Sequence, residues 1–457
     1  MTTECDLGMA YSQLRQIWYI DDWSRARDVL WRWSSKDQEE RREALVGNRI
    51  VNPELQPRRV WDLYSNRVVP YWMMNAGWVR LQAMSHAWVD KKDRTAVWTP
   101  INGYEWPVPI PKDADLNLIR TEMLNLEEEY AWLDVLCLRQ EGGPREGGPR
   151  EDLRAEEWRL DVPTIGHVYR ERGVTCYLSG LGRPLTLNEG DLESDRSWFR
   201  RAWTLQEVGY RRVIAGDTPD GPLHAEGKDG KYETELLTQF YKKLRDTHHL
   251  YRMHDALAEM WTRVSTNPVD KIAGLAFVTY SQWIPAYSES ASLEHAWTAL
   301  VDSMDVWPRA QLFFLYPEPG DGGPKWRPSW HQAMTKPLLP YEVYASVDRD
   351  ETGGVDSCEV ECVEGFVRGL AVVKEGDRQG EFIVECNDDV LRFKITAAHT
   401  YPIPEDTYML ICGEFDRYNR HGNGPWVVGR SLPKGRLEKV SMVETFGCNL
   451  RDITGSC

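Results

Sequence analysis

Ser85, His86 and Trp88 bring a hydroxyl, an imidazole and an indole together at the end of a predicted buried strand. Ligands of open parallel sheets bind outside the carboxyl ends of the strands, so this segment could hold a polar, planar ligand. A buried turn whose polar side chains satisfy one another is an equally good interpretation of this segment alone.

A second segment, residues 132–140, sets one acidic residue inside an apolar run. Alternation along a strand would place the Asp134 carboxylate among apolar neighbours, where it needs a partner. Asp134 and Arg139 are therefore candidate ligand-binding residues near the same sheet edge. The alternative is a structural role in which Asp134 is buried and paired with Arg200 or Arg201.

A third segment, residues 198–209, is predicted to be a helix on which Arg200, Trp203 and Glu207 share one face, because their spacing is i, i+3 and i+7. A carboxylate can stabilise an oxocarbenium-like transition state while an aromatic ring orients the leaving base. The trio therefore suits cleavage of a glycosidic bond. On spacing alone, an ordinary salt bridge along a helix explains the same residues.

The composition of the 457 residues predicts two or three structural units and excludes some classes of partner. A formal net charge of -16 without a dense Lys/Arg tract argues against nucleic acid and anionic membranes. The nine cysteines are scattered, as in a reducing compartment, and no spacing of His or Cys favours a metal site. With no apolar leader or membrane-length run, we expect a soluble, cytoplasmic protein.

Strand-like and helix-like segments alternate between residues 79 and 215, which predicts a doubly wound, mostly parallel α/β sheet with right-handed crossovers. The predicted strands are Val79–Ser85, Tyr130–Cys137, Val174–Leu178 and Arg212–Ala215. The predicted helices are Asp115–Glu128, Pro163–Arg172 and Trp198–Gly209.

These patterns divide the chain into four regions. We expect a helical N-terminal region over 1–60, an α/β domain over 61–225, a helical connector over 226–310 and a β-rich module over 311–457. Helical periodicity from Tyr232 to Val264 marks the connector. Short alternating segments predict that the C-terminal module is antiparallel, namely Glu381–Glu385, Leu391–Ile395, Tyr408–Cys412 and Lys439–Val443.

The three segments that could do chemistry resemble, in order and wording, the motifs of the fungal heterokaryon-incompatibility (HET) domain. Met84–Val89 resembles a Leu-Ser-Tyr/His-x-Trp-Gly motif, Trp132–Gln140 a Trp-x-Asp-x-x-Cys-Ile-x-Gln motif, and Trp198–Glu207 a Trp-x-x-Arg-x-Trp-Thr-x-Gln-Glu motif. The resemblance covers about residues 80–208. Segments further on, such as Asn267–Ile272 and Ile284–Ser288, extend it over most of the chain.

The first motif departs from the HET pattern at two positions. Met84 stands where the family usually has Leu, and Val89 stands where it commonly has Gly. The loss of a glycine removes a backbone position that can adopt positive φ, which predicts a reshaped loop after the strand.

HET domains are distantly similar to Toll/interleukin-1 receptor (TIR) domains, some of which hydrolyse NAD at the nicotinamide glycosidic bond. The resemblance therefore implies a TIR/flavodoxin-like fold. It also implies a HET-type intracellular incompatibility or cell-death signalling protein that hydrolyses NAD or a related nucleotide. NAD enters as a substrate, and no bound cofactor is implied.

Trp203–Val208 resembles the Trp-Cys-Leu-x-Glu-Leu segment that carries the catalytic Glu of plant-type TIR domains. This similarity implies that Glu207 is the catalytic carboxylate. The ligand-binding residues that we expect around it are Ser85, His86, Trp88, Asp134, Arg139, Arg200 and Trp203.

The sequence leaves open whether the chain is an enzyme. One alternative is a non-enzymatic module that self-associates or binds a protein partner, in which case the same polar residues only hold the fold. Another is a HET scaffold recruited for different small-molecule, metabolic chemistry.

Overall fold

Strand β5 (Leu81–His86) lies inside a six-stranded sheet, and all six of its residues are buried. It pairs in parallel with β8 (Tyr130–Leu133) on one side and with β9 (Gly173–Tyr177) on the other. Strands that are covered on both faces are expected to be nearly continuous apolar runs. The sequences of β8 and β9 are largely of this kind. Two polar residues, Ser85 and His86, end β5 at this buried position.

The computed structural model describes residues 6–18, 22–74, 81–170, 172–209, 211–218, 232–247, 252–279, 281, 283–336, 339, 345–349, 356–358, 360–372, 376–386, 389–397, 399–412 and 424–445. The start of the first predicted strand, at Val79, lies outside these ranges. The chain divides into two compact units. One consists of Met1–Leu250 and Thr262–Ala291, and the other of Tyr251–Trp261 and Ser292–Cys457.

Strand order in the sheet of the first unit reverses at β5. The order is β10 (Arg211–Ile214), β9, β5, β8, β3 (Arg59–Asp62) and β4 (Arg67–Pro70). The first four strands are mutually parallel, whereas β3 and β4 add an antiparallel hairpin at one edge. An α/β unit is therefore confirmed, with a mixed sheet. From β5 the chain moves to β8 on one side and then returns to β9 on the other, which makes β5 a topological switch point.

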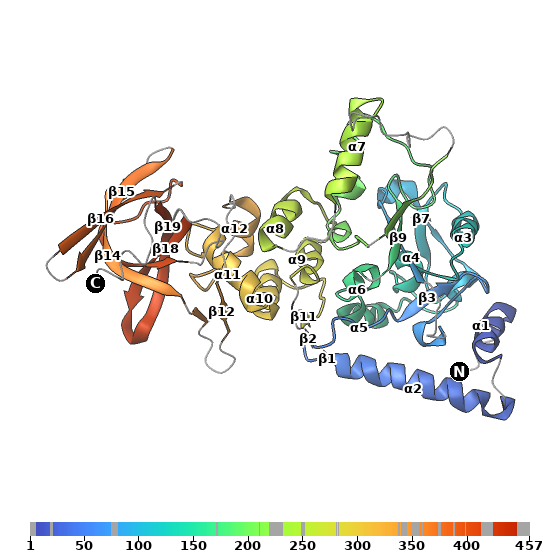
Figure 1. The fold of residues 1–457 in the computed structure, drawn as a ribbon. Helices are drawn as coiled ribbons and strands as arrows, with labels where there is room; N and C mark the ends of the chain where they lie inside the picture. The colour runs from blue at the N-terminus through green and yellow to red at the C-terminus, as the bar shows by residue number, and fades with distance from the viewer. Residues whose placement is uncertain are drawn as a thin grey trace. The chain divides into compact units, whose positions relative to one another are not determined.

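Right-handed crossovers that leave a switch point in opposite directions place their helices on opposite faces of the sheet. Figure 1 shows this arrangement for α3 (Leu116–Asn125) and α6 (Ile165–Arg170). Asp115 caps α3, because its side chain accepts a hydrogen bond from the backbone N–H of Asn117 at 2.7 Å. In α6, Tyr169 donates its hydroxyl to the carbonyl of Met84 at 3.0 Å, which fixes the end of β5 against the helix.

The predicted strand Tyr130–Cys137 is too long. β8 ends at Leu133, and Asp134–Cys137 forms the short helix α4. The Asp134 side chain accepts a hydrogen bond from the backbone N–H of Val135 at 2.7 Å, which favours a turn over a continued strand. Asp134 therefore stands at the carboxyl end of β8 and does not alternate within the sheet.

The predicted helix over Trp198–Gly209 is wrong. Two separate 3-10 turns take its place, η5 (Trp198–Arg200) and η6 (Trp203–Leu205). Glu207 follows the second turn in irregular backbone. Arg200, Trp203 and Glu207 consequently do not share a helical face.

Hydrogen bonds to a distant segment, and others within residues 198–204, explain why no helix forms here. Arg201 forms a parallel bridge with Val264, and the N–H of Val264 donates to the carbonyl of Arg200 at 2.6 Å. The Thr204 hydroxyl donates to the carbonyls of Trp198 at 2.6 Å and Arg201 at 2.8 Å. These bonds compete with the hydrogen bonds of a helix and hold the backbone in two turns.

Arginines tie the N-terminal helices to the α/β unit. In α1 (Leu7–Ile17), Arg15 contacts Glu129 at 2.7 Å and the Tyr130 hydroxyl at 3.0 Å. In α2 (Ala26–Ala44), the buried Arg41 donates to the carbonyls of Gln56 and Pro57, both at 3.2 Å. Hydrogen bonds to charged groups are stronger than neutral ones, so these contacts position both helices.

Short elements complete the first unit. They are η1 (Trp23–Arg25), β1 (Leu45–Val46), β2 (Arg49–Ile50), η2 (Tyr71–Met73), η3 (Lys91–Asp93), β6 (Arg94–Val97), η4 (Pro100–Asn102), β7 (Val108–Pro111), α5 (Glu151–Asp161), α7 (Glu235–Asp246), α9 (Val269–Ala276) and β11 (Ile284–Pro285). The helical periodicity between Tyr232 and Val264 is confirmed by α7 and by α8 (Met253–Thr262).

The second unit combines helices with a closed antiparallel barrel of six strands. Its helices after α8 are α10 (Leu293–Ser303), α11 (Val306–Leu315) and α12 (Trp330–Thr335), and β12 (Val347–Asp348) pairs with β13 (Ser357–Cys358). The barrel order is β14 (Glu361–Arg368), β15 (Arg378–Cys386), β16 (Asp389–Ala397), β19 (Arg436–Thr445), β18 (Gly424–Leu432) and β17 (Asp406–Cys412), with η7 (Pro433–Gly435) between β18 and β19. The predicted antiparallel module is confirmed, and each of its four predicted strands lies within one of these.

Among the described residues, every helix is too short or too polar to cross a membrane.

A buried lysine connects the barrel to the helices of its own unit. Lys439 on β19 is 2 % exposed, and its ammonium group donates to the carbonyl of Phe313 at 2.5 Å. The ammonium also lies 5.3 Å from the centre of the Phe313 ring. Burial lowers the pKa of Lys439 to about 7, because the charged form is poorly solvated there.

We expect Lys439→Met to stabilise the protein at neutral pH. The pKa of Lys439 is depressed on folding, so the unfolded chain binds more protons between pH 7 and 10, and the wild type gains stability as pH rises. The advantage of the variant should therefore be about 2–4 kcal/mol at pH 7 and should shrink toward pH 10. Urea denaturation followed by circular dichroism at both pH values measures this difference. Lys325→Met, at an exposed lysine of the same unit, is the control, and an advantage that is the same at both pH values would contradict the prediction.

Candidate functional site

The hydroxyl of Ser85 joins two segments that are far apart in the sequence. Its oxygen donates a short hydrogen bond to Oε2 of Glu207 and accepts one from Nε1 of Trp198 at 2.7 Å. Ser85 is completely buried, and Trp198 is almost so. A hydroxyl group can donate one hydrogen bond and accept others, so the Ser85 hydroxyl makes both kinds of hydrogen bond that are open to it. It brings Glu207 to the last residues of β5.

His86 and Asp134 form a second pair, at the carboxyl ends of β5 and β8. Nε2 of His86 lies 2.9 Å from Oδ1 of Asp134, and Nδ1 lies 3.4 Å from the carbonyl of Ala87. Because both ring nitrogens face oxygen acceptors, the doubly protonated, positively charged ring is favoured. Burial opposes that charge, but Asp134, together with Glu207 and the Ala87 carbonyl, outweighs the burial and raises the pKa of His86. The partner of Asp134 is thus His86, and not Arg200 or Arg201.

The carboxyl group of Glu207 is held in a protonation state that can change near neutral pH. Burial raises the pKa of Glu207 to about 7, and the negative charge of Asp134 adds to the shift, whereas the hydrogen bond from Ser85 and the charges of His86 and Arg263 oppose it. Part of the residue remains exposed to solvent, although the carboxyl group itself is buried. A buried carboxyl group with a perturbed pKa is a candidate for chemistry.

Trp88 extends the cluster beyond the end of β5. Its indole lies 5.3 Å from the imidazole of His86, with the two rings tilted by 37°. The same indole also contacts Arg94, whose guanidinium carbon lies 4.9 Å from the centre of the indole ring. Trp88 and Arg94 are partly exposed, so an aromatic ring and a cation border the cluster on its solvent side.

Three of the predicted ligand-binding residues make their contacts elsewhere. Arg139 is buried in an ion network with Glu105 at 3.3 Å and Glu157 at 3.4 Å. Arg200 pairs with Asp195 at 3.1 Å. These two arginines hold the fold and do not touch the Ser85–Glu207 pair.

Trp203 is the third residue held away from the cluster. Its indole lies 6.2 Å from the ring of Tyr287 and hydrogen-bonds to Asp270, which also accepts the Tyr287 hydroxyl at 2.7 Å. Burial raises the pKa of Asp270, although those hydrogen bonds act against the shift. Asp270 and Tyr287 hold Trp203 through these contacts.

Sequence reasoning overlooked two residues that shape the cluster. Trp198 opens the third motif, and its indole N–H satisfies Ser85, so the motif itself held the signal. Arg263 is 3 % exposed and donates to the carbonyl of Arg201 and to Oγ1 of Thr204, both at 2.8 Å. Its distance along the sequence gave no signal, because no spacing rule connects position 263 with position 204.

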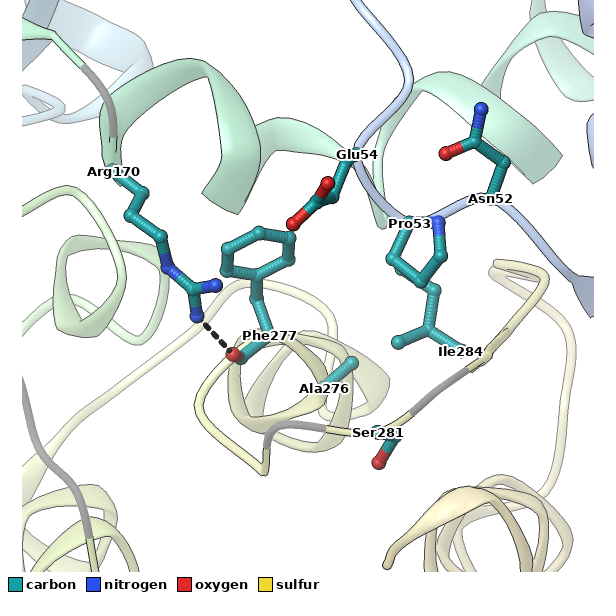
Figure 2. A pocket seen from close by; sticks show the side chains of 8 residues that line it. All are labelled: Asn52, Pro53, Glu54, Arg170, Ala276, Phe277, Ser281 and Ile284. Carbon is teal, nitrogen blue, oxygen red and sulfur yellow. Dashed lines mark hydrogen bonds between the residues drawn. The ribbon is translucent and has the colours of Figure 1, made fainter.

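A cavity of about 230 Å³ lies apart from these residues, and Figure 2 shows its lining. Arg170 and Glu54 flank the ring of Phe277 there, and Arg170 donates to the Phe277 carbonyl at 3.2 Å. None of the residues predicted to bind a ligand lines it; the lining consists of Asn52, Pro53, Glu54, Arg170, Ala276, Phe277, Ser281 and Ile284. We take the polar cluster as the candidate site, because a carboxyl group and an imidazole with shifted pKa values converge there at the carboxyl ends of the strands.

Within the described ranges, no group of three or more His, Cys, Asp or Glu residues is placed to hold a metal ion. Cys137 and Cys176 are buried beside the cluster, and burial raises the pKa of each thiol to about 12. A thiol with so high a pKa is a poor nucleophile at neutral pH. The chemistry of the cluster is therefore that of a carboxylate, a hydroxyl and an imidazolium.

No family model, curated protein or solved structure matches the chain.

We expect Glu207→Gln to become more stabilising as pH rises. The pKa of Glu207 is raised on folding, so its contribution to stability is complete below the unfolded pKa of 4.5 and is lost as pH rises through about 7. A full shift corresponds to about 3 kcal/mol, and solvent at the exposed part of the residue reduces this to about 1–2 kcal/mol. Gln keeps the shape and never ionises. Denaturation of both proteins at pH 5 and pH 8 measures the change, and a pH-independent difference would show that Glu207 titrates normally.

Proposed function

We propose that this chain hydrolyses the N-glycosidic bond of NAD or a related nucleotide, as an intracellular HET-type protein of incompatibility or cell-death signalling. The observation that carries the proposal is the Glu207 carboxyl group, which contacts Ser85 at the switch point of the sheet beside the His86–Asp134 pair. Ligands of doubly wound sheets bind at such a point. A carboxyl group in a buried, polar setting is suited to stabilising a positive charge that develops on a bound sugar.

The proposed reaction balances with water as the only co-substrate. The oxygen of water adds to C1′ of the nicotinamide ribose while the bond from C1′ to the ring nitrogen breaks. The bonding electron pair leaves with nicotinamide, whose cationic ring becomes neutral, and one proton is released. In the transition state the ribose carries oxocarbenium-like charge, which the Glu207 carboxylate stabilises. The Ser85 hydroxyl holds that carboxylate in place by donating to it.

Two further features support the proposal. All three segments that resemble the HET motifs contribute to one cluster, through Ser85 and His86, through Asp134, and through Trp198 and Glu207. The four parallel strands also follow the order β8, β5, β9, β10, which corresponds to 2-1-3-4 in order of appearance. Flavodoxin-like sheets begin with the same order, so we propose a TIR/flavodoxin-like unit that differs by the β3–β4 hairpin.

We expect purified protein to release nicotinamide from NAD and Glu207→Gln to release it at least 100-fold more slowly, because the variant cannot place negative charge beside the ribose. Nicotinamide is quantified by liquid chromatography. Glu189→Gln, at an exposed glutamate of the same unit, is the matched control and should match the wild type. Equal turnover by Glu207→Gln and wild type would remove Glu207 from the mechanism.

The pH profile should report the ionisation of Glu207. Because the ionised carboxylate is the active form and the pKa of Glu207 is about 7, kcat/KM should rise with pH. The rise should be about tenfold between pH 6 and pH 8. A flat profile across this range, in a protein that does release nicotinamide, would mean that a different group limits the reaction.

The second candidate is a non-enzymatic module that self-associates or binds a protein partner. The observation in its favour is that Ser85, Glu207 and Trp198 satisfy one another, as they would if they only fastened residues 198–207 to β5. Under this alternative, Glu207→Gln changes only the stability. Neither the wild type nor the variant then releases nicotinamide, even when the chain is fused to a domain that forces its assembly. Nicotinamide release by the forced assembly would exclude it.

A further inference from the structure

Arg94 carries an unused hydrogen-bonding group beside the candidate site. Its side chain lies over the Trp88 indole, which in turn packs against His86. Nε of Arg94 is buried and has no hydrogen-bond partner in the described part of the chain. Asp90, an acidic residue close to it in sequence, forms an ion pair with Arg196. The charges of Glu141 and Asp90 act on Arg94, but among the described residues neither carboxylate is hydrogen-bonded to it. A partly buried guanidinium without such a partner is costly.

Arg201, which lies within the third motif, is a second such cation. It is partly exposed, and within the described residues its guanidinium forms no hydrogen bond or ion pair. Burial lowers the pKa of Arg201, Asp270 and Glu207 oppose the shift, and the positive charge of Arg94 adds to it. The charges of Arg94 and Glu207 thus both act on the Arg201 guanidinium. Asp270 is occupied by Tyr287 and Trp203 and does not neutralise Arg201 at hydrogen-bonding distance.

The cluster borders cations whose hydrogen-bonding capacity is not used. Acidic groups act on Arg94 and Arg201 through their charges, but among the described residues Asp90 is paired with Arg196, Asp195 with Arg200 and Asp270 with Tyr287. Gln206, next to Glu207, is 5 % exposed, and neither atom of its side-chain amide has a hydrogen-bond partner among the described residues. Buried polar groups are nearly always paired, so the unpaired amide next to Glu207 in the sequence and the unused donors of the arginines point to a ligand with several acceptor oxygens.

We infer that Arg94 and Arg201 form a subsite for the phosphate groups of a nucleotide, so that the candidate site takes phosphorylated nucleosides and not free ones. The planar guanidinium matches the oxygens of a phosphate and can bind two of them at once, which is why Arg is used widely for phosphate recognition. The inference rests on the proposed function in one respect, namely that the phosphates belong to the substrate whose glycosidic bond lies at Glu207. The Trp88 indole contacts the Arg94 guanidinium and favours one orientation of it.

Binding of ADP-ribose and adenosine tests this subsite independently of turnover. ADP-ribose is the phosphorylated product of the proposed reaction and lacks the bond that would be cleaved, whereas adenosine has no phosphate. Titration calorimetry would compare the wild type with Arg94→Met, Arg201→Met and the control Arg27→Met, at an exposed arginine of α2. We expect the wild type to bind ADP-ribose at least tenfold more tightly than adenosine, and Arg94→Met or Arg201→Met to weaken ADP-ribose binding by about 10–100-fold without changing adenosine binding.

The outcomes separate the subsite from the proposed reaction. Unchanged ADP-ribose affinity in both Met variants, or no binding of ADP-ribose by the wild type, would overturn the subsite. Arg94→Lys keeps the charge without the planar fork, so an intermediate loss supports a phosphate contact and guards against a folding defect in Arg94→Met. If ADP-ribose binding depends on both arginines while NAD is not hydrolysed, the subsite stands and the hydrolase fails.

Discussion

The hydrogen bonds made by one serine hydroxyl organise the candidate site. Ser85 ends the strand at which sheet order reverses, and its hydroxyl fastens the carboxyl group of Glu207 and the indole of Trp198 to that strand. Residues 198–207 have little regular structure of their own, so these bonds and the Arg201–Val264 bridge determine where Glu207 lies. Without the serine, a buried carboxyl group would lose its donor, which is among the more costly changes a protein interior can suffer.

Burial and charge act against each other throughout this cluster. Burial raises the pKa of Glu207, and the nearby positive charges of His86 and Arg263 limit that rise to about 7. Asp134 has the opposite effects on its two neighbours, because it supports the charge on His86 and disfavours the charge on Glu207. The proposed hydrolase and the proposed phosphate subsite both depend on the same arrangement, in which the Glu207 carboxyl group, with a pKa of about 7, lies among positively charged groups.

Much of this could be predicted from the sequence, because local pattern determines much of the fold. Buried runs gave the parallel strands, and alternation gave the C-terminal barrel strands. Two predictions of secondary structure failed, one because of hydrogen bonds to a distant segment and one because of a hydrogen bond to a side chain. The helix expected over 198–209 is broken because Val264 and Arg263 bond to its backbone, and β8 stops at Leu133 because Asp134 bonds to the next N–H. Motif resemblance selected Ser85, His86, Trp88, Asp134 and Glu207, which do converge. It also selected Arg139, Arg200 and Trp203, whose partners lie elsewhere, because a motif does not reveal which way a side chain points.

A crystal structure of the wild-type protein with carba-NAD, whose nicotinamide–ribose linkage resists hydrolysis, tests the central claim most directly. The account predicts that the nicotinamide ribose lies against the Glu207 carboxyl group, with the phosphates at Arg94 and Arg201. An analogue bound in the cavity near Arg170, or a Glu207 carboxyl group that contacts only Ser85 while the analogue occupies another surface, would contradict it.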